Sequence, residues 1–161
     1  MIKLIRCDDR MIHGQCIVRI LSDFKINRII GIDDFTAGNA MLKKIYQLAV
    51  PPGVQGGVYS EEEALEEIKN HLDDNEVVLI LMKSPLSAPK LFDTIDALPK
   101  ELNIGPMSSR KDTAKVTLYA YLTAEEISAL NKLKEAGIRV YFNQVIDQKI
   151  DEWSQLADNF R

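Results

Sequence analysis

The sequence predicts an α/β fold: an open, mostly parallel twisted sheet with helices on both faces, arranged in three layers as a single domain. Short apolar runs alternate with amphipathic segments along all 161 residues, which is typical of strands joined by helical crossovers. Every side chain of residues 77–82 is apolar, as expected for a central strand covered on both faces. No linker or shift in composition marks an internal boundary, so we expect residues 1–161 to form one domain.

Seven short apolar runs are the predicted strands. They cover residues 3–7, 28–33, 54–59, 76–82, 102–104, 116–122 and 138–142. Because segments of helical periodicity separate most of these runs, we expect most of the connections to cross over from one parallel strand to the next.

Three segments between the early strands carry apolar side chains at helical spacing, and we interpret these faces as packing surfaces. The faces consist of Cys16, Ile17, Ile20, Leu21 and Phe24 in the first segment, Met41, Ile45 and Leu48 in the second, and Ala64, Leu65, Ile68 and Leu72 in the third. Ser60 with Glu63, and Thr123 with Glu126, have the spacing of capping boxes, which predicts two helix starts.

Prolines and glycines predict where two helices end. Residues 51–53, Pro-Pro-Gly, must end the second helix, because proline removes a backbone donor and disfavours helical geometry in the residue before it. Gly137 stops the helix that begins near Thr123. A last short helix is predicted over residues 151–159, where Trp153 anchors the C-terminal segment.

Composition excludes several classes of protein. The chain has 20 basic and 24 acidic side chains and a formal net charge of -4, so a nucleic-acid binder is not expected. No apolar stretch approaches the ~20 residues of a membrane helix. Cys7 and Cys16 read as small buried residues, and with His13 and His71 they form neither a disulfide framework nor a zinc cluster. We therefore expect a cytoplasmic protein without a metal or cofactor.

One segment carries an unusual concentration of reactive side chains. Residues 8–15, Asp-Asp-Arg-Met-Ile-His-Gly-Gln, lie between the first predicted strand and the first predicted helix. In an open parallel sheet such a loop lies at the carboxyl edge, where ligands bind. Two carboxylates, a guanidinium, an imidazole and a glycine are more than an ordinary turn requires, so this loop is the candidate site.

The chemistry of this loop suits a phosphohistidine. His13 precedes the helix start, where unpaired backbone N–H groups and the helix dipole favour an anion. Arg10 offers a planar fork of donors to phosphate oxygens, and a neutral imidazole is a competent nucleophile for a phosphoryl group. Asp8 or Asp9 fixes the tautomer of the ring, holds Arg10 or caps the loop, and these alternatives remain open.

Two other functions fit the same loop. A doubly wound module could hold an anionic metabolite at the helix start without catalysis. A hydrolase could use His13 as a general base, although no serine or cysteine nucleophile motif accompanies it. Neither glycine-rich phosphate motif, for dinucleotides or for ATP, occurs in the chain, so a phosphoryl group is expected to arrive on a protein or a small molecule.

Residues 8–15 resemble the D-D-R-L-I-H-G-Q signature of the IIB component of the mannose/fructose/sorbose family of the phosphoenolpyruvate-dependent sugar phosphotransferase system. The similarity extends over essentially the whole chain. It includes Asp33-Asp34, residues 39–54, Lys83-Ser84-Pro85, and residues 102–105 followed by Met107.

The resemblance implies a phosphotransferase that is a cytoplasmic phosphocarrier with the same α/β fold. On this reading His13 is phosphorylated on Nδ1 by the phosphohistidine of a IIA component, and Arg10 stabilises the product. The phosphoryl group then passes to a sugar carried by the membrane subunits IIC and IID, with which the protein associates peripherally.

Four further residues are expected to bind or orient the phosphate. They are Asp9, Gly14, Gln15 and Ser84. Ser84 lies in a loop expected at the same sheet edge, where it could donate its hydroxyl or its backbone N–H.

The chain departs from the family pattern at several positions. Cys16 replaces a common valine, residues 20–21 replace a frequent tryptophan, and Pro106 replaces the second glycine of an N-x-G-G-M segment. Residues 108–111 stand where an aromatic segment is usual, so a mannose specificity does not transfer. The cluster of Arg110, Lys111 and Lys115 could dock a partner or be an ordinary surface loop.

Overall fold

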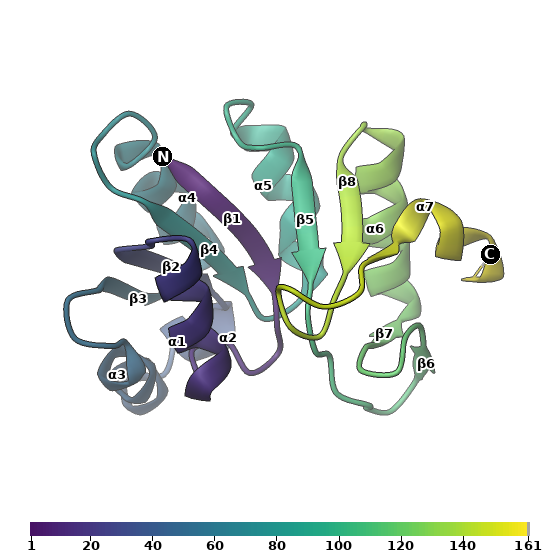
Figure 1. Ribbon diagram of the computed structural model, residues 1–161, viewed down its shortest axis with the longest axis horizontal. Helices are drawn as coiled ribbons and strands as arrows, with labels where there is room; N and C mark the ends of the chain where they lie inside the picture. The colour runs from purple at the N-terminus through teal and green to yellow at the C-terminus, as the bar shows by residue number, and fades with distance from the viewer. Residues whose placement is uncertain (161) are drawn as a thin grey trace.

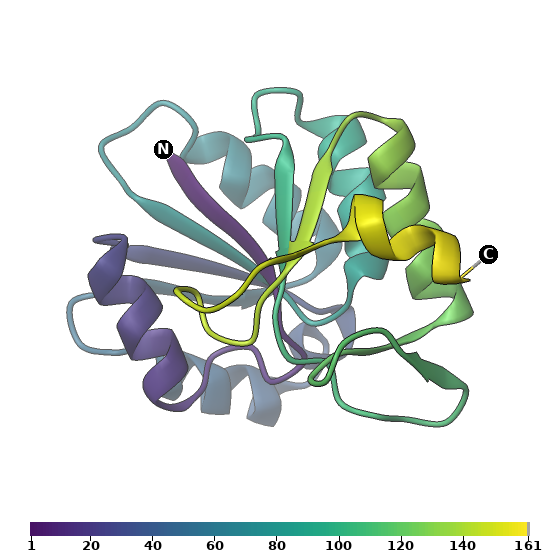
Figure 2. The same ribbon diagram turned by 45° about the vertical axis from the view of Figure 1, so that its right-hand side comes forward.

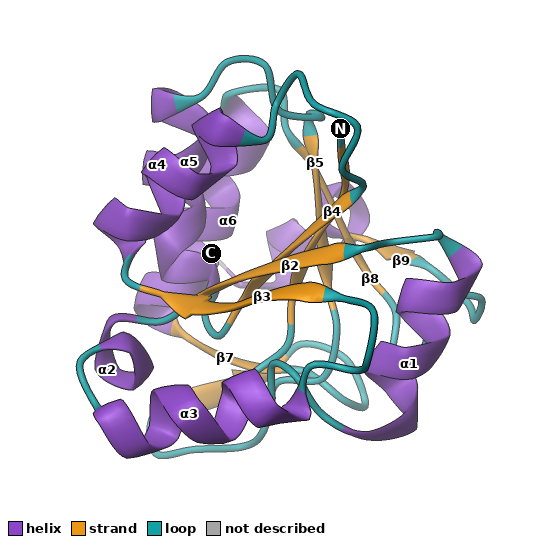
Figure 3. Ribbon diagram, turned by 90° about the vertical axis from the view of Figure 1, so that its left-hand side faces the viewer, coloured by secondary structure: helices purple, strands orange, loops and turns teal. Residues whose placement is uncertain are grey.

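A seven-stranded sheet forms the centre of the computed structural model, which describes residues 1–160. Its strand order is β3-β2-β4-β1-β5-β8-β9 (Figures 1 and 3). The strands are β1 (Ile2–Cys7), β2 (Arg28–Ile32), β3 (Gln55–Tyr59), β4 (Val78–Met82), β5 (Glu101–Ile104), β8 (Arg139–Phe142) and β9 (Asp151–Glu152). Every pair is parallel except β8 with β9. The predicted mostly parallel α/β fold is confirmed.

Helices cover both faces of the sheet, as predicted (Figure 3). On one face lie α1 (Gly14–Asp23) and α3 (Ala40–Ala49); on the other lie α4 (Glu61–Asn70), α5 (Ala88–Thr94) and α6 (Ala124–Glu135). The shorter helices are α2 (Asp34–Ala37), η1 (Pro85–Ser87), α7 (Trp153–Leu156) and η2 (Ala157–Phe160). Each face of the sheet buries its own apolar cluster, and every residue of β4 is buried.

The predicted helix boundaries follow from local chemistry. Both capping boxes are present, at Ser60 with Glu63 and at Thr123 with Glu126. In each, the hydroxyl accepts from the backbone N–H of the glutamate, and the carboxylate accepts from the backbone N–H of the capping residue. The helix α3 ends before Pro51, and α6 ends before Gly137, whose φ is 83°.

The prediction of a strand over residues 116–122 is wrong. The chain forms a separate antiparallel hairpin of β6 (Thr113–Lys115) and β7 (Tyr121–Thr123), and most of the predicted strand is its turn. The edge of β5 away from β1 is already paired with β8, so the segment finds no place in the central sheet. Val116 and Leu122 still bury their side chains, whereas Leu118 is 85% exposed.

The prediction that Met41, Ile45 and Leu48 form a packing surface is also wrong. These side chains of α3 are 74%, 54% and 76% exposed. The helix packs instead through Tyr46, which is partly buried against the cluster beneath α1. It lies over the edge strand β3, whose residues 56–57 are both glycine, so this edge offers little apolar surface to cover.

The C-terminal segment differs in detail from the helix predicted over residues 151–159. The chain first pairs as β9 with β8 and then forms α7 and η2. Trp153 anchors this segment as predicted: it is fully buried, its Nε1 donates to Asn131 Oδ1 at 3.1 Å, and its ring stacks on Phe160. Between β8 and β9 the chain crosses in front of β5 and β8 (Figure 2). Within residues 1–160, no helix is long and apolar enough to cross a membrane.

Candidate active site

The loop of residues 8–13 lies at the carboxyl edge of the sheet, between β1 and α1. In the sheet β1 lies between β4 and β5. The helix that follows β1 is α1, whereas the helices that follow β4 and β5 along the chain, α5 and α6, lie on the opposite face (Figure 3). Such a reversal opens a crevice outside the strand ends, which is where ligands bind in open α/β sheets. The predicted position of the candidate loop is confirmed.

His13 occupies the N-cap position of α1 but leaves the helix start open. Its side chain makes no capping hydrogen bond, and the first turn carries no acidic residue. The backbone N–H groups at this end are thus available to an anion. His13 Nε2 is buried without a hydrogen-bond partner, whereas Nδ1 is not among the enclosed unpartnered atoms of residues 1–160. Of the two ring nitrogens, Nε2 is thus the enclosed one and Nδ1 is not.

Asp8 holds Arg10 in place. The Asp8 carboxylate is buried, and its Oδ1 accepts from the backbone N–H of Arg10 at 3.0 Å and from Arg10 Nε at 3.4 Å. The Arg10 side chain is 48% exposed, and its terminal nitrogens make no hydrogen bond within residues 1–160. Three roles were left open for Asp8, and these hydrogen bonds match two of them: Asp8 holds Arg10 and caps the loop. The outer edge of the guanidinium remains able to bind an anion.

Asp9 ties this loop to the loop that follows β5. Its Oδ2 accepts from the backbone N–H of Ser108 at 2.6 Å, and its own backbone N–H donates to Pro106 O at 3.2 Å. The other oxygen, Oδ1, is buried without a partner. Two loops separated by about a hundred residues in sequence are thus joined beside His13, and Asp9 positions the loop.

Buried side chains and an unusual backbone set the path of the loop. Met11 and Ile12 are buried, and a β-carbon added at Gly31 of β2 would lie 2.9 Å from Met11 Cε. Gly14 has φ +56° with open space around its α-carbon. The backbone conformation therefore favours glycine here, because other residues pay roughly 1–2 kcal/mol in this region. Gln15 is exposed at the helix start.

Comparison with known proteins identifies the family. Residues 2–160 match the profile of the family described as "PTS system sorbose subfamily IIB component". The chain belongs to this family. It is 28% identical to the "PTS system mannose-specific EIIAB component" of Escherichia coli over 89% of its length, and it spans 44% of that relative. It is 24% identical to the "PTS system fructose-specific EIIB component" of Bacillus subtilis, over 98% of this chain and 96% of the relative.

Solved structures agree with this assignment. The crystal structure of the IIBSor domain of the sorbose permease from Klebsiella pneumoniae is 25% identical. It superimposes with a TM-score of 0.91, covering 100% of this chain and 98% of the other. The fold of this IIB chain therefore matches a solved IIB structure from end to end.

Ser84 of this IIB chain lies at the same sheet edge, but its hydroxyl is already engaged. Ser84 Oγ donates to Glu126 Oε2 at 2.8 Å and accepts from the backbone N–H of Leu86 at 3.3 Å. Of the two donors predicted for Ser84, the backbone N–H is the one that these bonds leave open. The role of Ser84 toward phosphate stays a prediction in that form.

Glu126 is a residue whose second role the sequence concealed. It is almost fully buried, and besides capping α6 it accepts from Ser84 and from Arg110 Nη2, the latter at 2.9 Å. The capping-box pattern located Glu126, but it carried no sign of these distant partners. Arg110, predicted as part of a docking cluster, is thus bound to its own chain. Docking by Lys111 and Lys115 stays a prediction.

Glu126→Gln is expected to lower the free energy of unfolding by about 1–2 kcal/mol, because hydrogen bonds between charged groups are stronger than neutral ones. The glutamine side chain still offers an oxygen that can accept the capping hydrogen bond of α6, but it lacks the negative charge that faces Arg110. Urea titration followed by circular dichroism measures the change. The neighbouring Glu125→Gln, an exposed position, should change stability by less than about 0.5 kcal/mol; equal losses in both variants would contradict the role of Glu126.

Arg6 is a second residue that sequence analysis missed. Its guanidinium is fully buried, and it donates to Asn103 Oδ1, to Asn143 Oδ1 at 3.2 Å and to the Gln144 carbonyl at 3.1 Å. A β-carbon at Gly105 would lie 2.2 Å from Arg6 Nη2, so only glycine leaves room. These bonds join β1 and β5 to the segment after β8. The sequence does contain one signal for this network: Arg6 and Asn103 are polar residues inside apolar strands, and Asn143 directly follows another.

The two cysteines differ in accessibility. Cys7 is fully buried, and burial, followed by the charge of Glu126, raises the pKa of its thiol well above the usual range. Cys16 is partly exposed, so the prediction of a buried residue is confirmed for Cys7 and wrong for Cys16. Because the thiolate is the reactive form, we expect iodoacetamide to modify only Cys16 in the native protein at pH 8, and both cysteines in urea. Mass spectrometry counts the adducts, and rapid native modification of Cys7 would contradict this expectation.

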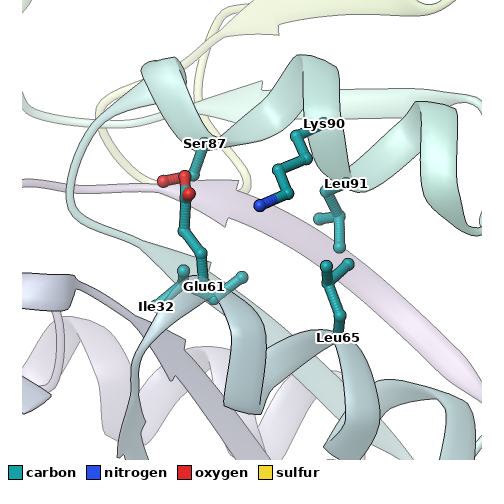
Figure 4. Close-up of a pocket in the computed structure, with 6 residues that line it drawn as sticks. All are labelled: Ile32, Glu61, Leu65, Ser87, Lys90 and Leu91. Carbon is teal, nitrogen blue, oxygen red and sulfur yellow. The ribbon is translucent and has the colours of Figure 1, made fainter.

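The pocket between α4 and α5 plays no part in this site (Figure 4). Its cavity volume is about 10 Å³, the space of roughly one water molecule. It is lined by Ile32, Glu61, Leu65, Ser87, Lys90 and Leu91. None of these is a predicted site residue, and a sugar does not fit.

Proposed function

We propose that this chain is a histidine phosphocarrier of sugar uptake. It accepts a phosphoryl group from a phosphohistidine on a IIA component and transfers it to an incoming sugar at a membrane IIC/IID complex. The observation that carries the proposal is the unpartnered side chain of His13 at an uncapped helix start, in the same short loop as the half-exposed Arg10. Family membership supports the same role.

Two transfers make up the proposed cycle. In the first, Nδ1 of neutral His13 attacks the phosphorus, the nitrogen–phosphorus bond of the donor breaks, and the donor imidazole leaves neutral. In the second, a sugar hydroxyl attacks, the bond to His13 breaks, and the hydroxyl proton is released to solvent. Positioned positive charge and dipoles stabilise a phosphoryl group in transfer.

The residues of the loop have different roles in these two phosphoryl transfers. The fork of Arg10 holds the phosphoryl oxygens, and Asp8 keeps Arg10 in position. Gly14 and Gln15 supply backbone N–H groups at the helix start, and Asp9 orients the loop.

The proposal also covers the location of the protein in the cell and the class of sugar that it phosphorylates. We place it in the cytoplasm as a single phosphotransferase domain over residues 1–161, associated peripherally with the membrane complex. Relatives are named for mannose, fructose, sorbose and N-acetylgalactosamine. We therefore propose a hexose or an N-acetylated hexosamine as the acceptor class.

A reconstituted phosphorelay tests the function. The chain is mixed with phosphoenolpyruvate, the general phosphotransferase proteins and a IIA component, and its intact mass is recorded. We expect one phosphoryl group, stable in alkali and lost in acid, on the peptide that contains His13. An unchanged mass together with saturable binding of an anionic metabolite would instead identify a binding module.

Arg10→Lys is expected to slow phosphorylation of His13 by about tenfold or more, because lysine keeps the charge but loses the planar fork. Single-turnover labelling measures the rate, and circular dichroism checks that the fold is retained. Arg19→Lys, a variant of an exposed arginine on α1, is the matched control and should react at the wild-type rate. Equal rates for Arg10→Lys and wild type would exclude bidentate binding.

A further inference from the structure

Met11, two residues before His13, has a backbone conformation that residues with a side chain seldom adopt. Its φ is 55°, in the left-handed region, where the β-carbon of an L-residue crowds the next carbonyl oxygen. Within residues 1–160, the other non-glycine residues with positive φ are Lys25 and Asp112, and both are exposed. Met11 is 2% exposed. Such a conformation persists where the surrounding structure holds it, so the contacts of Met11 are informative.

The side chain of Met11 extends across the sheet to β2. It belongs to the apolar cluster that contains Ile29, Val58 and Leu81, and β4 lies between β1 and β2 in the sheet. Its terminal methyl group has space because Gly31 of β2 has no side chain: a β-carbon there would lie 2.9 Å from Met11 Cε. The glycine therefore makes room for the Met11 side chain, whose burial holds the loop against the sheet.

The conformation of Met11 sets the direction in which the chain continues to His13. The backbone N–H of Met11 donates to Asp8 O at 3.0 Å and closes a turn. His13 is extended, with φ -156° and ψ 146°, and Gly14 is again left-handed, with φ +56°. A return of Met11 to negative φ would rotate the following chain by about 100° or more. The imidazole would then lie elsewhere relative to Arg10.

We propose that Met11 is a positioning residue for phosphoryl transfer: its buried side chain, seated over Gly31, keeps the loop in the conformation that presents His13. This inference rests on the proposed function and adds the residue that fixes the place of the nucleophile. Transfer requires aligned reacting atoms, so a displaced imidazole lowers the maximal rate more than it raises KM for the donor. A residue that only filled the core would affect stability and leave the rate unchanged.

Leucine and isoleucine variants separate these two roles, because the two side chains contain the same atoms and differ only in where they branch. Met11→Leu keeps an unbranched β-carbon, whereas Met11→Ile places a branch at a left-handed position, which β-branched residues avoid. Initial rates of His13 phosphorylation are measured against the concentration of phosphorylated IIA. We expect Met11→Leu to stay within about twofold of wild type, and Met11→Ile to lose about tenfold or more in maximal rate with KM within about threefold.

Lys25 supplies the matched control for the leucine and isoleucine pair. It has φ 54° and is exposed in the turn between α1 and β2, at the end of α1 away from His13. Lys25→Leu and Lys25→Ile should both be phosphorylated at the wild-type rate, even where isoleucine lowers the midpoint of thermal unfolding. Circular dichroism checks the fold of all four variants.

Gly31→Ala tests the same contact from the side of the sheet. The new methyl group would lie 2.9 Å from Met11 Cε and 3.1 Å from both Gly57 O and Val58 Cγ2, so the Met11 side chain must move. We expect the maximal rate to fall about threefold or more in Gly31→Ala. The same change added to Met11→Ala should cause no further fall, because the contact is already absent there.

The outcomes separate this inference from the function on which it rests. If wild type is labelled on His13 while Met11→Leu and Met11→Ile react at equal rates, the positioning role is overturned and the function stands. Independent effects of Gly31→Ala and Met11→Ala on the rate would overturn it as well, and this comparison decides the matter if Met11→Ile does not fold. If wild type is never labelled, the function and the positioning role both fail.

Discussion

His13→Ala is expected to abolish acceptance of the phosphoryl group, leaving no acid-labile label after complete incubation with phosphorylated IIA. The chain has two histidines, and His13 is the one with an unpartnered side chain at an uncapped helix start. Alanine removes the nucleophile itself, so the loss is complete rather than partial. Because the His13 side chain makes no hydrogen bond within residues 1–160, removal should change the midpoint of thermal unfolding by no more than a few degrees.

His71→Ala is the matched control and should leave labelling at the wild-type level. His71 ends α4 and forms close contacts with Asp74 and Glu67. A hydrogen bond from His71 lowers the pKa of Asp74. A phosphoryl group on His71 would face these two carboxylates. Label that survives in His13→Ala and disappears in His71→Ala would refute the assignment of the nucleophile.

Arg6→Met is expected to produce the largest loss of stability, about 3 kcal/mol in the free energy of unfolding. Methionine is unbranched and apolar but shorter than arginine, and it donates no hydrogen bond, so the Asn103 side chain and the Gln144 carbonyl lose their partner inside the protein. A buried acceptor left unpaired costs about 1–3 kcal/mol. For a chain of this size the midpoint of thermal unfolding should fall by roughly 6–12 °C.

Arg19→Met provides the comparison at the surface. Arg19 is 51% exposed and pairs with Asp23 and Asp147. Exposed ion pairs contribute about 0–1 kcal/mol, so this variant should remain close to wild type in urea titration. If Arg6→Met were as stable as Arg19→Met, the buried network would contribute little, and the segment after β8 would be held by packing alone.

The candidate site could be predicted from the sequence because its chemistry lies in consecutive residues. His13, Arg10 and the two aspartates occupy one short loop between a strand and a helix. The position of that loop at the carboxyl edge follows from the order of elements alone. The capping boxes at Ser60 and Thr123 were predictable for the same reason, since each is a contact between residues three positions apart.

Residues whose role depends on distant partners could not be assigned in this way. Glu126 was identified as a cap, yet its bonds to Ser84 and Arg110 exist only because the loops after β4 and β5 meet the start of α6. Arg6 reads as a polar residue in an apolar strand until Asn143 is brought beside it. Neither contact has a local pattern that could reveal it.

The amino-acid sequence alone was enough to predict most of the elements, their alternation and the loop that carries the reactive side chains, because periodicity, capping and the grouping of such side chains are local properties. The tertiary structure decided which apolar surfaces are covered. Periodicity could not distinguish the exposed apolar face of α3 from a core face, and it could not exclude residues 116–122 from the sheet. Burial depends on whether a neighbouring surface is present, and that is settled only by the order in which the strands pair.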